Sequence, residues 1–547
     1  MNEQGRRRAP ALWWIAAVAS VFAAKDFLPQ FLRDDLYQGD LCQHVWWTYR
    51  FADPGLFPND PIAAFMSRPI LAPYGWQTLY RMFAPFVDSQ RFAETIPFVL
   101  TVLVVVLAFR LGDLIGGLTG GVAAATYISA THALRQLEGG LPRSFALPIV
   151  LFGVCSLIAR RHAMFGVALL LAALLYPPVM VNLAALGLVV IGYRTFRDRR
   201  LPAGWLALAA LTLAAMVVML SAYAGPTPAD IGPRVTAEQA RAMPEYWPGG
   251  RARFFEHDAS RFYFTSSRSG LEIRPMNLVV GFIVMVMVGS LLGWGISLEA
   301  WALGATSVGC FILAHATLFL LHYPNRYAKY ALTVFIMMWL ADAVPRVLEA
   351  VRSRMAGRGM PVVRYGTVLH AAAWLILVGV AWGATRSIAR DLAAPIPAGR
   401  EEALAFIGSL PRDTLVAAHP LDADMVTLRA RRSVLASMET SLPYYAAYYK
   451  ENAARIESEL AATYATDLRD VTALNEKYGV AVFLLNRQRF GKQGWRYFLP
   501  FEEANRARFE RGRREGFALL QLPAERILFQ KGDYAVVRLA APPGGSR

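Results

Sequence analysis

Two successive apolar stretches decide the class of fold: TIPFVLTVLVVVLAFR, residues 95–110, and LIGGLTGGVAAATYISATHAL, residues 114–134. Each is close to the roughly 20 residues that a helix needs to cross a hydrocarbon core about 30 Å thick. Similar stretches recur along the 547 residues, of which 55% are hydrophobic and only 18% are charged. The mean hydropathy of +0.34 is too high for a soluble protein of this size. The sequence therefore predicts a mainly α, polytopic membrane protein.

We expect about eleven transmembrane helices. They lie near residues 11–24, 95–110, 114–134, 144–159, 163–176, 179–193, 203–224, 276–296, 300–321, 328–344 and 366–385. The first could instead be a cleaved signal peptide, because Phe22-Ala23-Ala24 resembles a cleavage site, but the many later spans favour a retained anchor. The two segments that meet at Tyr176-Pro177-Pro178 could form one kinked helix, because Pro breaks the helical hydrogen-bond ladder. We keep two, since merging them would move the later Arg-rich loops out of the cytoplasm.

The distribution of Arg predicts the orientation. Arg6, Arg7 and Arg8 precede the first span, and loops rich in Lys and Arg stay in the cytoplasm. Alternating the loops from there also places the Arg clusters at 194–200 and 346–364 inside. The net charge of +16 therefore reflects membrane orientation, and we do not expect nucleic-acid binding.

The chain divides into two predicted parts. Residues 1–385 form the transmembrane module, with long outer loops at 25–94 and 225–275, and residues 386–547 form a soluble α/β domain on the outer side. Periodicity in this domain predicts helices at 401–410 and 444–464, strands at 414–418, 433–437 and 480–485, and a hairpin over 527–539. In the 225–275 loop it predicts a short helix at 237–241, followed by a turn.

The first outer loop contains the best candidate for chemistry. Asp40 and His44 are four residues apart, so they share one face of a predicted amphipathic helix, DLCQHVWWTYRF, that would lie at the membrane interface. A carboxylate here could act as a general base toward an acceptor hydroxyl or could hold a divalent cation, Mg²⁺ or Mn²⁺. The structural alternative is that Asp40 caps the helix after Gly39. Asp35, just upstream, is a further acidic candidate.

The segment before the tenth span offers cations for an anion. Arg326 and Lys329 lie there beside Tyr327, and Arg can bind a phosphate bidentately while Lys acts as a point charge. The alternative role is anchoring at the interface. Other outer loops add these candidates: Arg143, Glu256, His257 and Asp258.

Together these residues resemble the GT-C superfamily of integral-membrane glycosyltransferases, in particular the bacterial members that use polyprenyl-phosphate-linked sugars. The resemblance covers the whole chain in architecture, and its motifs are Gly39-Asp40 with Gln43-His44 and Pro324-Asn325-Arg326-Tyr327. It implies inverting sugar transfer from a lipid-linked donor to a lipid, glycan or protein acceptor at the outer face of the bacterial inner membrane. It also implies that Asp40 is the base or metal ligand and that Arg326 and Lys329 hold the donor phosphate.

Two other functions stay open at this stage. A non-catalytic scaffold with a partner-binding outer domain would have Asp40 facing solvent as a cap, with no cavity beneath it. A transporter or flippase would need a polar pathway through the spans, and ionisable residues within them are few.

Overall fold

The structure is a computed structural model, and it describes residues 14–21, 25, 27–28, 32, 39–223, 227–292, 297–321, 323–356, 397, 399–492 and 494–539. The predicted span at 366–385 and the candidate Asp35 lie outside these ranges.

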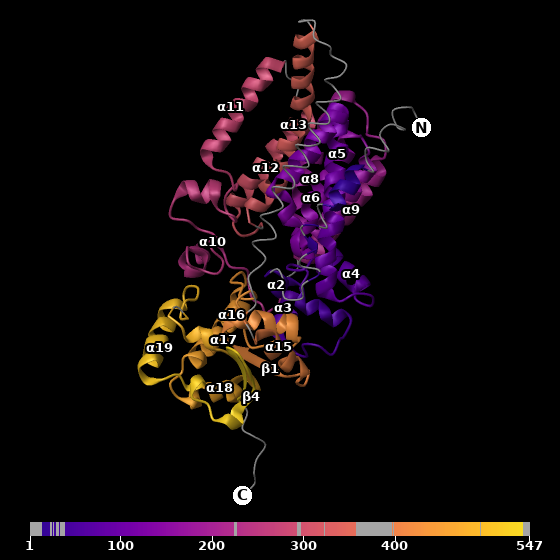
Figure 1. Ribbon diagram of the computed structural model, residues 1–547. Coiled ribbons are helices and arrows are strands. Elements are labelled where there is room, and N and C mark those ends of the chain that lie inside the picture. The colour runs from indigo at the N-terminus through magenta and orange to yellow at the C-terminus, as the bar shows by residue number, and fades with distance from the viewer. Residues whose placement is uncertain are drawn as a thin grey trace.

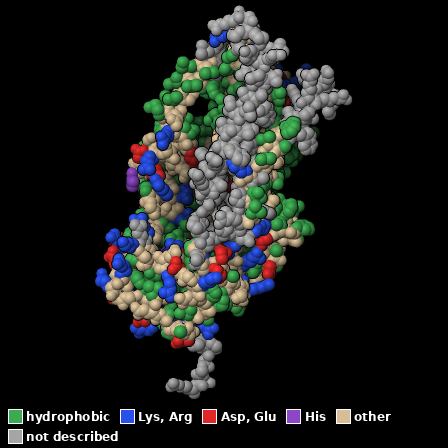
Figure 2. All heavy atoms as spheres, in the orientation of Figure 1, with side chains coloured by type: hydrophobic (Ala, Val, Ile, Leu, Met, Phe, Trp, Pro, Cys, Tyr) green, Lys and Arg blue, Asp and Glu red, His purple; other side chains and the backbone are tan. Residues whose placement is uncertain are grey.

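Long apolar helices form an elongated bundle, and a smaller domain lies at one end of it (Figure 1). The main helices are α5 (Ser89–Ala130), α6 (Ala146–Ile158), α7 (His162–Leu175), α8 (Pro177–Asp198), α9 (Trp205–Tyr223), α11 (Pro275–Leu292), α12 (Leu298–Ala316) and α13 (Asn325–Ala356). Among the described residues, five helices are long and apolar enough to cross a membrane: α5, α8, α9, α12 and α13. In Figure 2, hydrophobic side chains cover much of the bundle surface that is coloured on this face. Charged side chains gather toward the end of the molecule where the C-terminal domain lies. This distribution fits a bundle embedded in lipid with one end in water.

Helix α5 contains both of the stretches that decide the fold. Its helical geometry breaks at Gly116 and Gly117, where Gly117 has a φ of +64° that favours glycine. The chain reverses direction there, and Gly112 and Gly120, on either side of the break, consequently lie against each other. A Cβ added to Gly112 would be 2.3 Å from the carbonyl oxygen of Gly120. The prediction of two separate helices is confirmed, although the second ends at Ala130.

Two other helix boundaries bear on the predicted spans. The backbone breaks at Tyr176, between α7 and α8, so the two helices expected around Pro177 are distinct. Helix α12 ends at Ala316, before the predicted limit of 321. The residues that follow leave the helix because Phe319 packs against Tyr246 and Phe254 of the second outer loop.

The C-terminal part contains a five-stranded sheet in the order β2-β1-β3-β5-β4. The strands are β1 (Leu415–Ala418), β2 (Ser433–Val434), β3 (Val482–Asn486), β4 (Ile527–Lys531) and β5 (Tyr534–Arg538). Strand β1 pairs in parallel with β2 and β3, and β5 is antiparallel to β3 and β4. The helices are α15 (Arg400–Ser409), α16 (Pro420–Met425), α17 (Ala446–Thr463), α18 (Leu468–Tyr478) and α19 (Glu502–Glu515). The α/β character and the terminal hairpin agree with the prediction, whereas β2 is shorter than expected.

The first outer loop forms the junction between bundle and domain. Its predicted amphipathic helix is instead a short α2 (Leu41–His44) followed by a 3₁₀ helix, η1 (Trp46–Phe51). The expectation of an interfacial position is wrong, because Trp46 and Trp47 are at most 2% exposed. Trp46 packs edge-on against Phe57, and the guanidinium of Arg431 from the C-terminal part lies 4.1 Å from the ring of Tyr49. The aromatic face that suggested a membrane surface is covered by protein.

Short helices complete the two outer loops. In the first loop they are α3 (Pro61–Met66) and α4 (Tyr74–Phe83), and Phe65 stacks on Tyr448 of α17 at 3.5 Å between ring centroids. In the second loop, α10 (Ala237–Ala242) forms where a helix was predicted, and Thr236 and Gln239 cap it reciprocally. The stacking of Phe65 on Tyr448, together with the hydrogen bond from the backbone N–H of Val235 to the backbone oxygen of Tyr444 at 2.9 Å, joins both outer loops to the C-terminal part.

Close backbone packing around α5 gives the first prediction. A Cβ at Gly120 would lie 2.6 Å from the carbonyl oxygens of both Ala341 and Gly112, and backbone atoms cannot rotate away as a side-chain end can. We expect Gly120→Val to lower the free energy of unfolding by about 1–3 kcal/mol, as overpacking does. Thermal unfolding of the purified protein in detergent would measure the loss. Gly309→Val is the matched control, since nothing lies within 4 Å of a Cβ there, and equal effects of the two changes would contradict the argument.

Candidate active site

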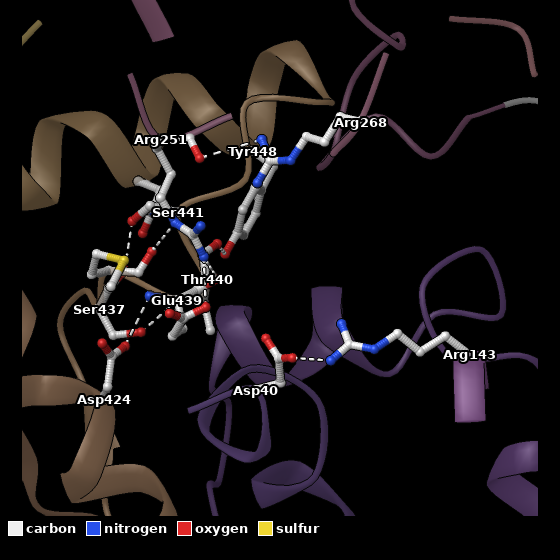
Figure 3. Close-up of polar contacts among 12 residues, drawn as sticks. Asp40, Arg143, Arg251, Arg268, Asp424, Ser437, Glu439, Thr440, Ser441 and Tyr448 are labelled. Carbon is white, nitrogen blue, oxygen red and sulfur yellow. Dashed lines mark hydrogen bonds and ion pairs between the residues drawn. The ribbon is translucent and has the colours of Figure 1, made fainter. Parts of the chain in front are cut away.

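Asp40 lies at the start of α2, but it does not cap this helix. Its side chain makes no cap hydrogen bond, and its carboxylate instead forms an ion pair with Arg143 of the 3₁₀ helix η3 (Pro142–Phe145). The side chains of Asp40 and Arg143 are 32% and 26% exposed, so the pair is half-buried and open to a ligand. The capping interpretation is therefore wrong, because the carboxylate points toward Arg143 (Figure 3).

The surroundings of Asp40 keep it ionised. Burial raises the pKa of its carboxyl, but the charge and hydrogen bond of Arg143, with a smaller effect of Arg251, outweigh burial and hold the pKa below its ordinary value. Burial lowers the pKa of His44 to about 4. At neutral pH the site thus contains a carboxylate next to an uncharged imidazole.

The second outer loop brings two more arginines to this region. Arg251 forms an ion pair with Glu439 at 2.6 Å and donates to the backbone oxygen of Met438 at 2.8 Å. The guanidinium of Arg268 donates to the backbone oxygen of Arg253 at 3.3 Å and lies 5.5 Å from the ring of Tyr323. In Figure 3, Arg251 and Glu439 lie on the side of Asp40 away from Arg143, and Arg268 lies above Asp40 in this view.

The start of α13 supplies the predicted phosphate-binding cations. Lys329 forms an ion pair with Glu272 at 2.7 Å. The Nε of Arg326 is buried and has no hydrogen-bond partner among the residues that the structure describes. Arg326 also lies close enough to Arg268 to interact with it electrostatically, as Lys329 does with Arg143. A buried donor without a partner, in a group of cations, suits an anionic ligand.

The structure therefore brings five of the ten predicted site residues together. Asp40, His44 and Arg143 form one side, and Arg326 and Lys329 lie near Arg143 at the same end of the bundle. The sequence analysis missed Arg251, Arg268 and Glu439. Nothing in their local sequence distinguishes them, apart from the Gly249-Gly250 turn that precedes Arg251, because they reach the site only through the tertiary fold.

Other predicted candidates point elsewhere. The ring of Tyr327 packs in an apolar cluster with Cys310 and Ala314. In the second outer loop, the structure gives these partners: Glu256 pairs with Arg253 at 2.8 Å, His257 stacks on Trp247 at 5.0 Å, and Asp258 accepts from the backbone N–H of Arg261 at 2.7 Å. Each of these three side chains thus has a partner within the second outer loop, and no contact described for them reaches Asp40.

The residues around Asp40 do not fit a divalent-cation site. Among the residues that the structure describes, no three side chains of His, Cys, Asp or Glu converge as metal ligands. Asp40 is paired with Arg143, and the positive charge of this guanidinium disfavours a second cation at the same carboxylate. We derive no step that depends on a metal.

No protein-family model and no curated protein sequence matches the chain. Among solved structures, ArnT from Cupriavidus metallidurans bound to undecaprenyl phosphate is 15% identical, with a TM-score of 0.50, and the match covers 98% of this chain and 100% of that one. Its apo state is 12% identical, with a TM-score of 0.51 and coverage of 97% and 100%. AglB from Archaeoglobus fulgidus, in complex with an inhibitory peptide and a dolichol-phosphate, is 11% identical, with a TM-score of 0.49 and coverage of 89% and 71%. The likeness to ArnT shows that this chain has the GT-C fold.

A buried acid behind Glu439 gives a prediction of pH dependence. Asp424 accepts from the backbone N–H of Glu439 at 2.9 Å, and burial, reinforced by the charge of Glu439, raises the pKa of Asp424 to about 8 from an ordinary 3.8. The folded state thus binds this proton more tightly than the unfolded chain. The stability that the proton contributes is complete below about pH 4 and is lost as the pH rises to about 8.

Asp424→Asn removes this titration without changing the shape of the side chain. We expect the melting temperature of the wild type minus that of the variant to decrease as the pH rises from 5 to 8. Differential scanning fluorimetry at each pH unit would measure the trend. Asp413→Asn, at an exposed position, is the control and should show none. A constant difference between wild type and Asp424→Asn would contradict the protonated state.

Proposed function

We propose that this protein is an inverting membrane glycosyltransferase that moves a sugar from a polyprenyl-phosphate donor to a lipid, glycan or protein acceptor. The observation that carries the proposal is the position of an ionised, half-buried carboxylate, Asp40, at the same end of the bundle as the cations of Arg326 and Lys329. Inverting transfer needs a base for the acceptor and positive charge for the departing phosphate. The GT-C fold that the chain shares with an ArnT structure bound to undecaprenyl phosphate supports this class of donor.

The reaction would be a single displacement. Asp40 takes the proton of an acceptor hydroxyl as that oxygen bonds to the anomeric carbon, and the bond from this carbon to the phosphate oxygen breaks. The electron pair leaves with the phosphate, whose charge Arg326 and Lys329 would stabilise, while Arg143 orients the carboxylate. Because the acceptor attacks opposite the leaving group, the configuration at the anomeric carbon inverts.

The location of the protein is part of the proposal. The apolar helices fit a bacterial inner membrane. With the N-terminus in the cytoplasm, the C-terminal domain, residues 386–547, and the two outer loops of the transmembrane module, residues 1–385, would lie in the periplasm. A lipid-linked donor would then reach the site from the bilayer, and an acceptor would reach it from the aqueous side.

A purely structural role predicts a different environment for Asp40. A scaffold protein would leave it as a solvent-facing cap, whereas the carboxylate makes no cap hydrogen bond and pairs with Arg143. Catalysis of sugar transfer is therefore the function that the geometry supports best.

Substitution of the base gives the first functional prediction. We expect Asp40→Asn to reduce sugar transfer by about 10²–10⁴-fold, the usual contribution of general acid–base catalysis. Mass spectrometry of lipid-linked and surface glycans in cells that carry the wild type, the variant or no gene product would measure the effect. Asp53→Asn, which changes an exposed loop carboxylate paired with Arg412, should leave transfer unchanged. Full transfer by Asp40→Asn would reject the role of Asp40 as base.

Substitution of the buried cation tests the donor site separately. We expect Arg326→Gln to weaken the binding of undecaprenyl phosphate by about tenfold or more, because hydrogen bonds to charged groups contribute roughly 1.5–3 kcal/mol. Native mass spectrometry of the purified protein with this lipid would measure the change. Arg346→Gln is the matched control on the same helix, since Arg346 pairs with Asp342 at 3.1 Å. Equal affinities for wild type and Arg326→Gln would remove Arg326 from the donor site.

A further inference from the structure

A polar pocket of about 540 Å³ lies between the first outer loop and the C-terminal sheet. This volume falls within the range of about 300–1,000 Å³ that is usual for small-molecule sites. The polar residues of its wall are Arg400, Asp422, Asp424, Glu439, Asn486, Gln488, Arg489, Lys492 and Tyr534. The functional roles above use none of these side chains to bind a ligand.

The side chains deepest in the structure are held in fixed positions. Asp422 is 9% exposed, and Arg489 donates two hydrogen bonds to its carboxylate, at 2.7 and 2.8 Å. Asn486 donates to the same carboxylate at 3.0 Å. A carboxylate offers about four lone-pair directions. The three hydrogen bonds from Arg489 and Asn486 therefore orient Asp422 and leave it able to accept one more. Preorganised groups of this kind are typical of binding sites.

Asp424 adds a group of the opposite hydrogen-bonding character. It is 7% exposed, and one carboxyl oxygen already accepts from the backbone of Glu439. Because its pKa is raised to about 8, the carboxyl is protonated at neutral pH and carries an O–H donor. Ser437 also hydrogen-bonds to Asp424, so the pocket wall carries two carboxyl groups of α16 in opposite protonation states, each held by neighbouring protein groups.

The pocket wall is continuous with the candidate active site. Gly39 and Cys42, on either side of Asp40 in the sequence, line it, as does Glu439, whose partner Arg251 interacts electrostatically with Asp40. A ligand that fills the pocket would thus lie next to the carboxylate proposed as the base.

The lining selects among ligand chemistries. The cations Arg400, Arg489 and Lys492 are offset by Asp422 and Glu439, so the wall lacks the strong positive excess that a phosphate needs. Five apolar side chains (Cys42, Pro397, Leu421, Met425 and Met438) share the wall with nine polar ones, which disfavours a lipid tail, since a tail would place its whole surface against an apolar lining. The carboxyl, amide and guanidinium groups of the wall together offer hydrogen-bond donors and acceptors, and each hydroxyl of a neutral sugar both donates and accepts.

We propose that this pocket binds a neutral carbohydrate, which is the acceptor of the transfer reaction. The role as acceptor rests on the proposed glycosyltransferase function, whereas the binding of carbohydrate does not. Of the three acceptor classes, the lining thereby favours a glycan, or a lipid with a sugar head, over a peptide.

The test uses the full-length protein in nanodiscs and a panel of neutral trisaccharides built from glucose, mannose, galactose or N-acetylglucosamine. Saturation-transfer difference NMR would detect binding without any need for catalysis. We expect Gly39→Trp to abolish it, because nothing lies within 4 Å of a Cβ at Gly39 and the indole can enter the pocket without backbone strain. Gly192→Trp, at an equally open position on α8, adds the same bulk elsewhere and should keep binding.

A second variant covers the chance that the tryptophan disturbs the fold. Asp422→Asn preserves the size of the side chain and should weaken trisaccharide binding about tenfold, the effect of one hydrogen bond to a charged group. Melting temperatures would check that both variants are folded. If no trisaccharide binds to the wild type, or if folded Gly39→Trp and Asp422→Asn bind as well as the wild type does, the pocket is not a carbohydrate site. Binding of undecaprenyl phosphate to the wild type, measured in parallel, separates this failure from a failure of the proposed function.

Discussion

The ion pair between Asp40 and Arg143 fixes the first outer loop against the transmembrane bundle, and the geometry of the candidate site depends on it. A half-buried pair of this kind contributes little to stability, often below about 1 kcal/mol. The main effect of the pair is therefore to fix the position of the Asp40 carboxylate. The pair directs the carboxylate of Asp40 to Arg143 and not to the backbone of α2, and Lys329 at the start of α13 lies within electrostatic reach of the same arginine. A single guanidinium thus connects the acid with the cations.

Packing of the C-terminal domain on the same loop makes this arrangement rigid. The rings of Trp46, Trp47 and Tyr49 are buried, and Cys42 contacts Met425 of the domain through their sulfur atoms at 3.7 Å. The loop is consequently held from the bundle side by charge and from the domain side by apolar contacts. Since the pocket beside Asp40 is lined by residues of both the loop and the domain, the site exists only where the two parts meet.

The sequence predicts those features that depend on local pattern. Apolar length located the helices, Gly116 and Gly117 coincide with the reversal in α5, and the strand pattern over 527–539 predicted the terminal hairpin. Asp40 was found because it shares one face of a predicted helix with His44, and Arg326 because it stands in a polar segment just before an apolar span. The interfacial helix was wrong because an exposed aromatic face and one covered by a distant domain have the same periodicity. Arg251 and Glu439 could not be predicted, since their pairing joins positions that only the tertiary structure brings together.

The same ion pair also constrains how Asp40 can act. Arg143 holds the pKa of Asp40 low, and a carboxylate that is always ionised is a weaker base than one whose pKa lies near the working pH. The charge of Arg143 must therefore be offset when a proton is transferred. The phosphate of a donor bound near Lys329 and Arg326 would provide that negative charge, and it would raise the basicity of Asp40 only when a donor is present. An acceptor that arrives first would meet a carboxylate still held by Arg143, so the geometry favours donor binding before proton transfer.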